Sequence, residues 1–123
     1  MSDFALGPIG QVSRHVCDIH ASTAWYRDVL GLKHLYQFGG LSFFDCDGLR
    51  IYLQQSDATG ADSILYFRVS DIEAAHLALV ERGVAFVQEP QRVHRHADGS
   101  EEWMAFFNDL EGRPLAIMAM TQG

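Results

Sequence analysis

The strongest constraint in this sequence is a pattern that occurs twice. The first copy is VSRHVCDIHASTAWYRDVLGL and the second is FRVSDIEAAHLALVERGV. Each copy has a strand-like stretch, an aspartate, an amphipathic stretch and a glycine. Asp18 and Asp71 lie 53 residues apart, and Gly31 and Gly83 lie 52 residues apart. A repeat of this period in a chain of 123 residues indicates an internal duplication.

The first copy predicts a strand followed by a capped helix. Its residues alternate between two faces up to Cys17, which is the period of a strand. Asp18 then supplies a short carboxylate that can accept hydrogen bonds from the first turn of a helix. The predicted buried face of that helix follows helical spacing and comprises Ser22, Trp25, Tyr26, Val29 and Leu30. Gly31 predicts the helix end, because a left-handed residue commonly follows a helix C-terminus.

The second copy repeats the order of elements with a different helix start. Phe67 and Val69 are the apolar positions of its strand. Ser70 and Glu73 have the spacing of a capping box, in which each side chain bonds the other residue's backbone N–H. Gly83 predicts the end of the helix.

The other segments complete the same series in both copies. The remaining strands are predicted over residues 33–38, 41–45, 49–54, 85–88, 103–108 and 114–120, with the first and fifth strands over 9–17 and 63–69. Asp47-Gly48 predicts a tight hairpin, and the polar stretch 89–102 is predicted to be a long loop. The sequence therefore predicts one α+β domain over residues 1–123. Its two βαβββ modules are expected at 9–56 and 62–120.

Composition and charge exclude several classes of function. The formal net charge of −7 opposes binding to nucleic acid, which requires basic patches. No apolar run approaches the roughly 20 residues that span a bilayer. The N-terminus lacks the regions of a signal peptide. Cys17 and Cys46 have no metal-ligand spacing, so we expect reduced thiols in a cytoplasmic protein.

At this point the chain resembles the vicinal oxygen chelate superfamily, which includes glyoxalase I, the bleomycin resistance proteins and extradiol dioxygenases. The resemblance covers about residues 9–120. It depends on VCD with SxxWYRDVLGL, on FRVSDIEAA with RGV, and on FFNDLEGRPLAIM. It implies two βαβββ modules with concave sheets, helices outside and a shared cavity inside. Together with the frequency of twofold oligomers, it leads us to expect a homodimer.

The resemblance also places four metal-ligand positions, which in metal-using members carry His, Glu or Gln. They correspond here to Gln11, Tyr52, Ile64 and Ala116. Ile64 and Ala116 have no donor atom, and a neutral phenol is a poor ligand. A one-residue shift at the last three positions gives only Ile51 or Leu53, Ser63 or Leu65, and Leu115 or Ile117. A divalent metal needs several converging donors, so we expect no metal and no other cofactor.

The residues that alternate with these positions form the predicted inner wall. The candidate ligand-binding residues are Gln11, Ser13, His15, Arg50, Tyr52, Gln54, Ile64, Tyr66, Arg68, Trp103, Met104, Phe106, Ala116 and Met118. This mostly apolar and aromatic set with a few polar groups is typical of a small-molecule pocket. A closed core made of the same residues is the alternative. Arg14 falls on the helix-facing side, where an unpaired charge is costly.

Several other groups admit two interpretations. His15 is either an acid or base on the inner face or a strand histidine held by local hydrogen bonds. The His94, His96 and Asp98 string is either a metal site or a solvated loop, and we favour a loop that covers the cavity mouth. His20, His34 and His76 are predicted at the surface. Cys17 is a candidate nucleophile, but no histidine is placed to activate it.

Three functional hypotheses remain. The first is a metal-free dimer that binds an apolar or aromatic small molecule, with no nucleic acid or membrane partner. The second is a metal-independent enzyme, such as a lyase or isomerase, in which His15, Tyr52 or Arg68 acts as acid, base or anion clamp. The third is a glyoxalase-like or dioxygenase-like enzyme with atypical metal ligands. We favour the first.

Overall fold

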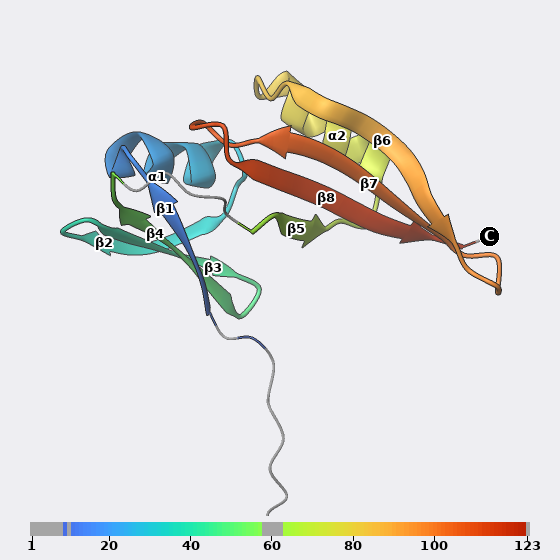
Figure 1. The fold of residues 1–123 in the computed structure, drawn as a ribbon, viewed down its shortest axis with the longest axis horizontal. Helices are drawn as coiled ribbons and strands as arrows, with labels where there is room; N and C mark the ends of the chain where they lie inside the picture. Colours follow the sequence, from blue (N-terminus) through green and yellow to red (C-terminus); the bar gives the residue numbers. More distant parts are fainter. Residues whose placement is uncertain (1–8, 10, 58–62, 123) are drawn as a thin grey trace, which may run out of the picture. The chain divides into compact units, whose positions relative to one another are not determined.

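The chain consists of two compact units, Met1–Ala58 and Thr59–Gly123. The computed structural model describes Ile9, residues 11–57 and residues 63–122. Within these residues, each unit has one helix and a four-stranded sheet (Figure 1). In the described part of the chain, neither helix is long and apolar enough to cross a membrane.

The first unit contains a mixed sheet, called the first sheet. Its elements are β1 (Gln11–Val16), α1 (Ile19–Asp28), β2 (Lys33–Phe38), β3 (Leu41–Cys46) and β4 (Leu49–Gln55). The strand order is β1-β4-β3-β2, with β1 parallel to β4 and the other pairs antiparallel. The Asp47-Gly48 hairpin is confirmed, since both residues have positive φ, 51° and 94°, as a tight turn requires.

The second unit contains the second sheet and repeats this topology. Its elements are β5 (Leu65–Arg68), α2 (Ile72–Glu81), β6 (Phe86–Arg95), β7 (Glu101–Asn108) and β8 (Pro114–Thr121). The strand order β5-β8-β7-β6, with β5 parallel to β8, matches that of the first sheet element by element. The predicted α+β fold of two βαβββ modules is therefore confirmed.

Both helices begin at an aspartate that bonds a backbone N–H three residues later. Asp18 accepts from the N–H of Ala21 at 3.0 Å, and Asp71 accepts from that of Ala74 at 3.1 Å. The capping box predicted at Ser70 was wrong, because the cap lies one residue further on. Glu73 lies in the first turn of α2, where its charge suits the helix dipole.

The long loop predicted over residues 89–102 was also wrong. β6 runs to Arg95 and pairs with β7 through three register shifts, and a short turn at residues 96–100 joins the two strands. Ser100, buried in this turn, donates from its N–H and its hydroxyl to Asp98 Oδ1, at 2.9 Å and 2.6 Å. This segment is a hairpin and not a covering loop.

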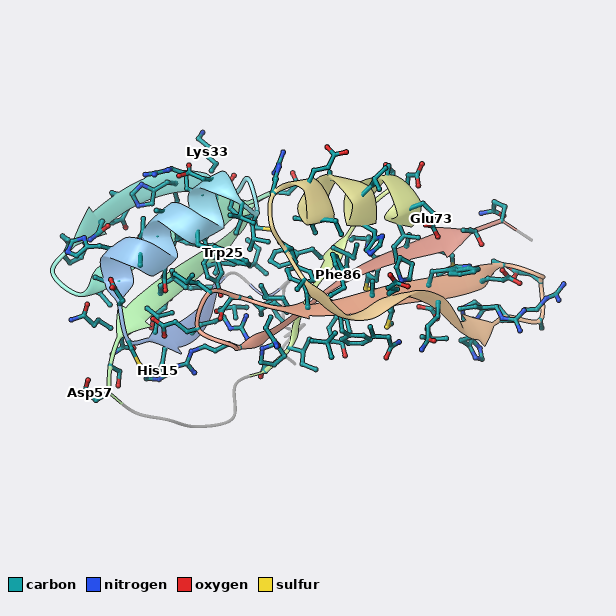
Figure 2. The ribbon with its side chains drawn as sticks, turned by 90° about the horizontal axis from the view of Figure 1, so that it is seen from above. His15, Trp25, Lys33, Asp57, Glu73 and Phe86 are labelled. Carbon is teal, nitrogen blue, oxygen red and sulfur yellow. The ribbon has the colours of Figure 1, made fainter. Side chains whose placement is uncertain are left out.

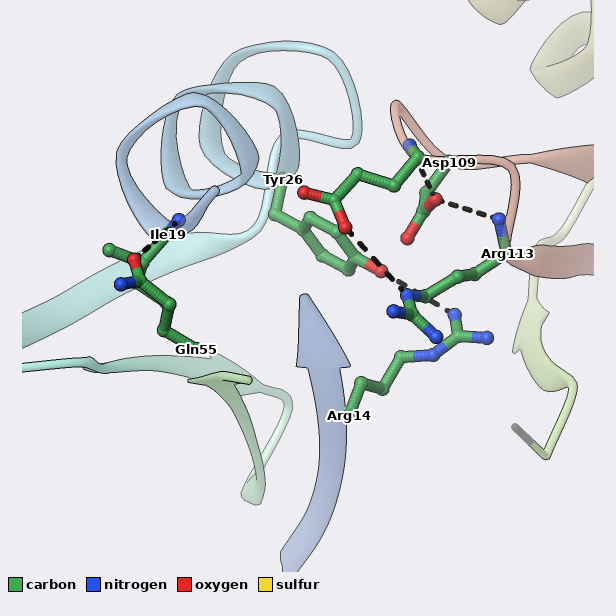
Figure 3. A network of polar contacts seen from close by, with 7 residues as sticks. Arg14, Ile19, Tyr26, Gln55, Asp109 and Arg113 are labelled. Atoms are coloured by element: carbon green, nitrogen blue, oxygen red, sulfur yellow. Dashed lines mark hydrogen bonds and ion pairs between the residues drawn. The ribbon is translucent and has the colours of Figure 1, made fainter. Parts of the chain in front are cut away.

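The core of the first unit lies between α1 and the first sheet. Tyr26, Phe44 and Leu53 are completely buried there. Arg14 is also buried on this side, as the alternation of β1 predicted, and donates from Nη1 to the Tyr26 hydroxyl at 3.4 Å. Gln55, at the end of β4, accepts from the N–H of Ile19 at 3.3 Å and ties the helix start to the sheet (Figure 3).

The core of the second unit lies between α2 and the second sheet. Phe107 and Leu115 are buried on the strands, and Ile72 and Leu79 are buried on the helix. The ring of Phe86, labelled in Figure 2, meets that of His76 edge to face, with centroids 4.5 Å apart. His76 is half-buried, so its prediction as a surface residue was wrong.

Candidate functional site: an aromatic sheet face in the first unit

The candidate site is built on the face of the first sheet that points away from α1, called the open face. Cross-strand partners share a face of a sheet. One row therefore runs from Ser13 through Tyr52 and Phe43 to Tyr36. The neighbouring rows are His15, Gln54, Leu41 and Phe38 on one side, and Gln11, Arg50 and Asp45 on the other.

A bulge in β2 turns Tyr36 toward the open face. The register shifts between His34 and Tyr36, so that His34 lies opposite Phe44 and Tyr36 lies opposite Phe43. Phe44 is fully buried on the helix side of the sheet, and the His34 ring packs against it at 5.1 Å. The prediction of His34 at the surface was therefore wrong. In a regular strand His34 and Tyr36 would share a face, because they are two residues apart. The bulge puts them on opposite sides of the sheet.

Four rings on the open face form a continuous cluster, the aromatic row: Tyr36, Phe38, Phe43 and Tyr52. Phe43 is at its centre, with ring centroids 4.7 Å from Tyr36, 6.0 Å from Phe38 and 5.2 Å from Tyr52. It is only 8% exposed, whereas Tyr36 is 45% and Phe38 58% exposed. The row therefore presents flat apolar surface supported by a buried ring.

Arg50 borders the aromatic row and is held in place by two contacts. Its guanidinium carbon lies 5.3 Å from the centre of the Phe43 ring. Its Nε donates to Oε1 of Gln11 at 2.7 Å. Asp45 lies opposite Arg50 in register, but its Oδ1 accepts from the N–H of Gly48 at 3.1 Å in the hairpin turn. The described residues contain no ion pair to Arg50.

His15, labelled in Figure 2, lies on the open face, and its register partner on β4 is Gln54. Its Nδ1 is buried and has no hydrogen-bond partner among the described residues. The interpretation of His15 as a strand histidine held by local hydrogen bonds is thus not met at Nδ1 in that part of the chain. An imidazole nitrogen without a protein partner can accept from or donate to a ligand.

The second sheet has its own open face, on the side away from α2. Tyr66 and Arg68 of β5 lie opposite Ala116 and Met118 of β8, and these lie opposite Phe106 and Met104 of β7. The Tyr66 and Phe106 rings, on either side of the buried Ala116, meet edge to face at 5.9 Å. Ile64 comes just before β5 and is 36% exposed.

Trp103 does not lie on the open face of the second sheet, where the other candidate residues of that sheet lie. It pairs with Ala119, whose neighbours Met118 and Met120 point to the open face. Together with Ser70, Asp71 and Thr121 it lines a groove of about 350 Å³ beside the start of α2. Trp103 is therefore not part of the same wall as Met104, because adjacent residues of a strand point to opposite faces.

The family's metal-ligand positions do not fit a metal in this chain. Gln11 supplies its Oε1 to Arg50, and Tyr52 stacks on Phe43. The side chains of Ile64 and Ala116 contain no donor atom. Within residues 11–57 and 63–122, no group of three or more His, Cys, Asp and Glu side chains could hold a metal ion.

The His94, His96 and Asp98 string lies at the tip of the β6–β7 hairpin. His96 Nε2 lies 2.9 Å from Glu102 Oε2, and the rings of His94 and His96 meet edge to face at 4.5 Å. The Asp98 carboxylate is engaged by Ser100, and these bonds lower the pKa of Asp98. The polar groups of His96 and Asp98 therefore bond within the hairpin.

Sequence reasoning missed the outer half of the site. Tyr36, Phe38 and Phe43 were not among the predicted residues, although they supply most of the aromatic row. Alternation within LSFFDC could have placed Phe43 on the same face as Leu41 and Asp45. No period-2 argument could have placed Tyr36, because the bulge interrupts the alternation of β2.

Comparison with known proteins places this fold in a family. The family model for the Glyoxalase/Bleomycin resistance protein/Dioxygenase superfamily matches residues 9–112. No curated protein sequence matches this chain. An integron cassette protein from V. cholerae is similar over 94% of this chain and 97% of its own, with 19% identity and a TM-score of 0.77.

Two other solved structures give the same result. The lactoylglutathione lyase of Agrobacterium tumefaciens shares 20% identity, with a TM-score of 0.74 over 93% of this chain and 94% of its own. A glyoxalase/bleomycin resistance protein/dioxygenase from Nocardioides shares 18% identity, with a TM-score of 0.74 over 98% and 87%. At these low identities the solved structures show only that the fold is shared. The family model, which matches residues 9–112, shows the family. The chain therefore belongs to the glyoxalase/bleomycin resistance protein/dioxygenase superfamily.

Proposed function

We propose that this protein binds a flat apolar or aromatic small molecule on the open face of the first sheet. The observation that carries the proposal is the aromatic row, in which two largely exposed rings stack on the buried Phe43. Stacked and edge-to-face aromatic contacts add about 0.5–1.5 kcal/mol each beyond the burial of area. Polar groups at the edges of the row, Gln11, Arg50 and His15, would orient the ligand.

The proposal is for binding without a metal, since two of the four family ligand positions have no donor atom. We also propose a homodimer, as the commonest closed oligomer. A cytoplasmic location is consistent with Cys17 and Cys46, neither of which forms a disulfide in the described part of the chain. Burial and the nearby Asp45 and Asp47 raise the pKa of the Cys46 thiol, which keeps it neutral and unreactive.

The proposal is tested by measuring how a neutral aromatic probe binds to the original protein and to one variant. We expect 2-naphthamide to bind and to shift backbone amide NMR signals of β2, β3 and β4. Tyr52→Ala should weaken this binding by about 1–3 kcal/mol, roughly five- to 150-fold, through loss of one aromatic surface and a hydrogen-bonding group. The control is Leu77→Ala, an exposed apolar residue of α2, which should bind like the original protein.

Thermal melts on the same variants separate a binding role from a packing role. If Tyr52 only fills a core, Tyr52→Ala should lower stability by about 3–5 kcal/mol. A stability loss of that size without any change in probe affinity would contradict the proposed site.

A metal-independent enzyme is the second candidate, and His15 favours it. Its imidazole lies on the open face, in the row next to that of Tyr52, where a proton-transfer group could reach a ligand on the aromatic row. NMR titration of the His15 ring with and without 2-naphthamide tests whether this imidazole contacts the ligand. An unchanged titration in the bound protein would count against a catalytic His15.

A further inference from the structure

We propose that the ligand of the first sheet is an aromatic carboxylate, with its ring on the aromatic row and its carboxylate on Arg50. This inference rests on the proposed function and names the chemical class that the same site recognises. It depends on how Arg50 is held, on which of its donors are used, and on the distance between its charge and the rings.

The position of Arg50 is fixed before any ligand arrives. Its Nε donates to Gln11 on β1 at 2.7 Å, and its guanidinium lies 5.3 Å from the Phe43 ring centre. These contacts use the Nε donor and one face of the guanidinium. A planar guanidinium held in this way loses less freedom on binding than a mobile side chain does.

The terminal donors of Arg50 remain available. Neither Nη1 nor Nη2 has a hydrogen-bond or ion-pair partner among the described residues, and the side chain is exposed. Asp45, the nearest acidic residue in register, bonds the Gly48 N–H instead. Two adjacent N–H groups of this kind match the two oxygens of a carboxylate.

The charge and the rings lie within reach of one small molecule. Phe43 contacts both Arg50 and the exposed Tyr36, so a ring stacked on the row brings a directly attached carboxylate toward the guanidinium. A hydrocarbon would leave the Arg50 donors to water, and a cationic ligand would be repelled. The net charge of −7 acts at long range on the association rate, whereas Arg50 acts at contact.

A matched pair of probes isolates the carboxylate. 2-Naphthoate and 2-naphthamide have the same ring and nearly the same shape and differ in charge. We expect 2-naphthoate to bind roughly three- to tenfold more tightly, as suits an exposed, charge-assisted contact. Calorimetry or fluorescence titration at one fixed ionic strength measures both affinities, because screening changes the ratio.

Three variants connect that preference to Arg50. Arg50→Met should abolish the preference, because 2-naphthoate loses an ion pair that the neutral 2-naphthamide never makes. Gln11→Glu should reduce it as well, because the new carboxylate would pair with Arg50 in place of the ligand. Arg92→Met is the matched control, since Arg92 belongs to the second unit and is paired with Glu101 at 3.1 Å, and it should keep the preference.

The outcomes separate this inference from the proposed function. Equal binding of both probes, or a preference that survives Arg50→Met, overturns the inference while the aromatic site stands. If neither probe binds, the aromatic site and the inference both fall. Melting temperatures of the three variants, expected to stay close to that of the original protein, exclude unfolding as the cause of lost binding.

Discussion

Arg14 and Tyr26 form a buried polar pair between β1 and α1. Both side chains are 1% exposed or less, and Nη1 of Arg14 donates to the Tyr26 hydroxyl at 3.4 Å. A buried guanidinium is stabilised only where acceptors replace the water it has lost. Tyr26 thus serves the first unit both as an aromatic core residue and as one of the acceptors of Arg14.

Tyr26→Phe removes that acceptor and keeps the ring. We expect the free energy of unfolding to fall by about 1–3 kcal/mol, measured by urea denaturation, because a buried donor loses a partner. Tyr36→Phe is the control, since Tyr36 is 45% exposed and its hydroxyl has no hydrogen-bond partner among the described residues. Equal effects of the two substitutions would contradict the role assigned to Tyr26.

Asp71, and not Ser70, should control the start of α2. Asp71→Ala removes the side-chain acceptor of the Ala74 N–H and should cost about 0.5–2 kcal/mol of stability. Ser70→Ala should change stability by less than about 0.5 kcal/mol, as at an ordinary surface position. Thermal melts of both variants test the assignment, and a larger loss for Ser70→Ala would restore the capping box that the sequence suggested.

The turn between β6 and β7 should stabilise the protein in a pH-dependent way. The Ser100 hydroxyl and N–H hold the pKa of Asp98 below its ordinary value of 3.8. A folded pKa below the unfolded one contributes stability that is complete above the unfolded value and is lost as the pH falls through the folded value. Carboxyl NMR titration should show the low pKa. Ser100→Ala should raise it, and an unchanged pKa would argue against this hydrogen bond.

The oligomeric state gives a separate prediction. We expect light scattering at tens of micromolar to give a dimer mass of about twice the 13.8 kDa of the chain. Exposed apolar residues outside the aromatic row, such as Tyr66 and Met120, are the kind that an interface removes from water. A mass of one chain at this concentration would contradict the dimer.

The fold could be predicted largely because its signals are local and repeated. The Asp18 cap and the Asp47-Gly48 turn each determine the backbone within a few residues. The outer part of β6 could not be predicted in this way. It is the edge strand of the second sheet, and its residues from Gln91 to Arg95 are all exposed, so no apolar alternation marks it. Pairing with β7 determines its structure.

The site was only partly predictable for a similar reason. The family resemblance placed Gln11 and Tyr52 on the inner face, and alternation along the regular strand β1 added His15 to it. Trp103 was predicted to line the cavity because it follows the 89–102 stretch, but the pairing of β7 with β8 places it on the opposite face from Met104. The contact between Arg50 and Gln11 depends on the parallel register of β1 and β4, which no single strand specifies.

The bulge after His34 divides β2 into one part that packs in the core and another part whose rings are exposed. The first part contains His34, which bonds the buried Ser42 hydroxyl at 3.1 Å. Substitution of His34 would therefore disturb the packing of the first unit. The second part supplies Tyr36 and Phe38, whose exposed rings take no part in that packing. Substitutions in the second part can therefore accumulate during evolution at little cost to folding. One strand thus gives descendants of this protein a segment in which the proposed ligand preference can change while the packing beneath α1 stays intact.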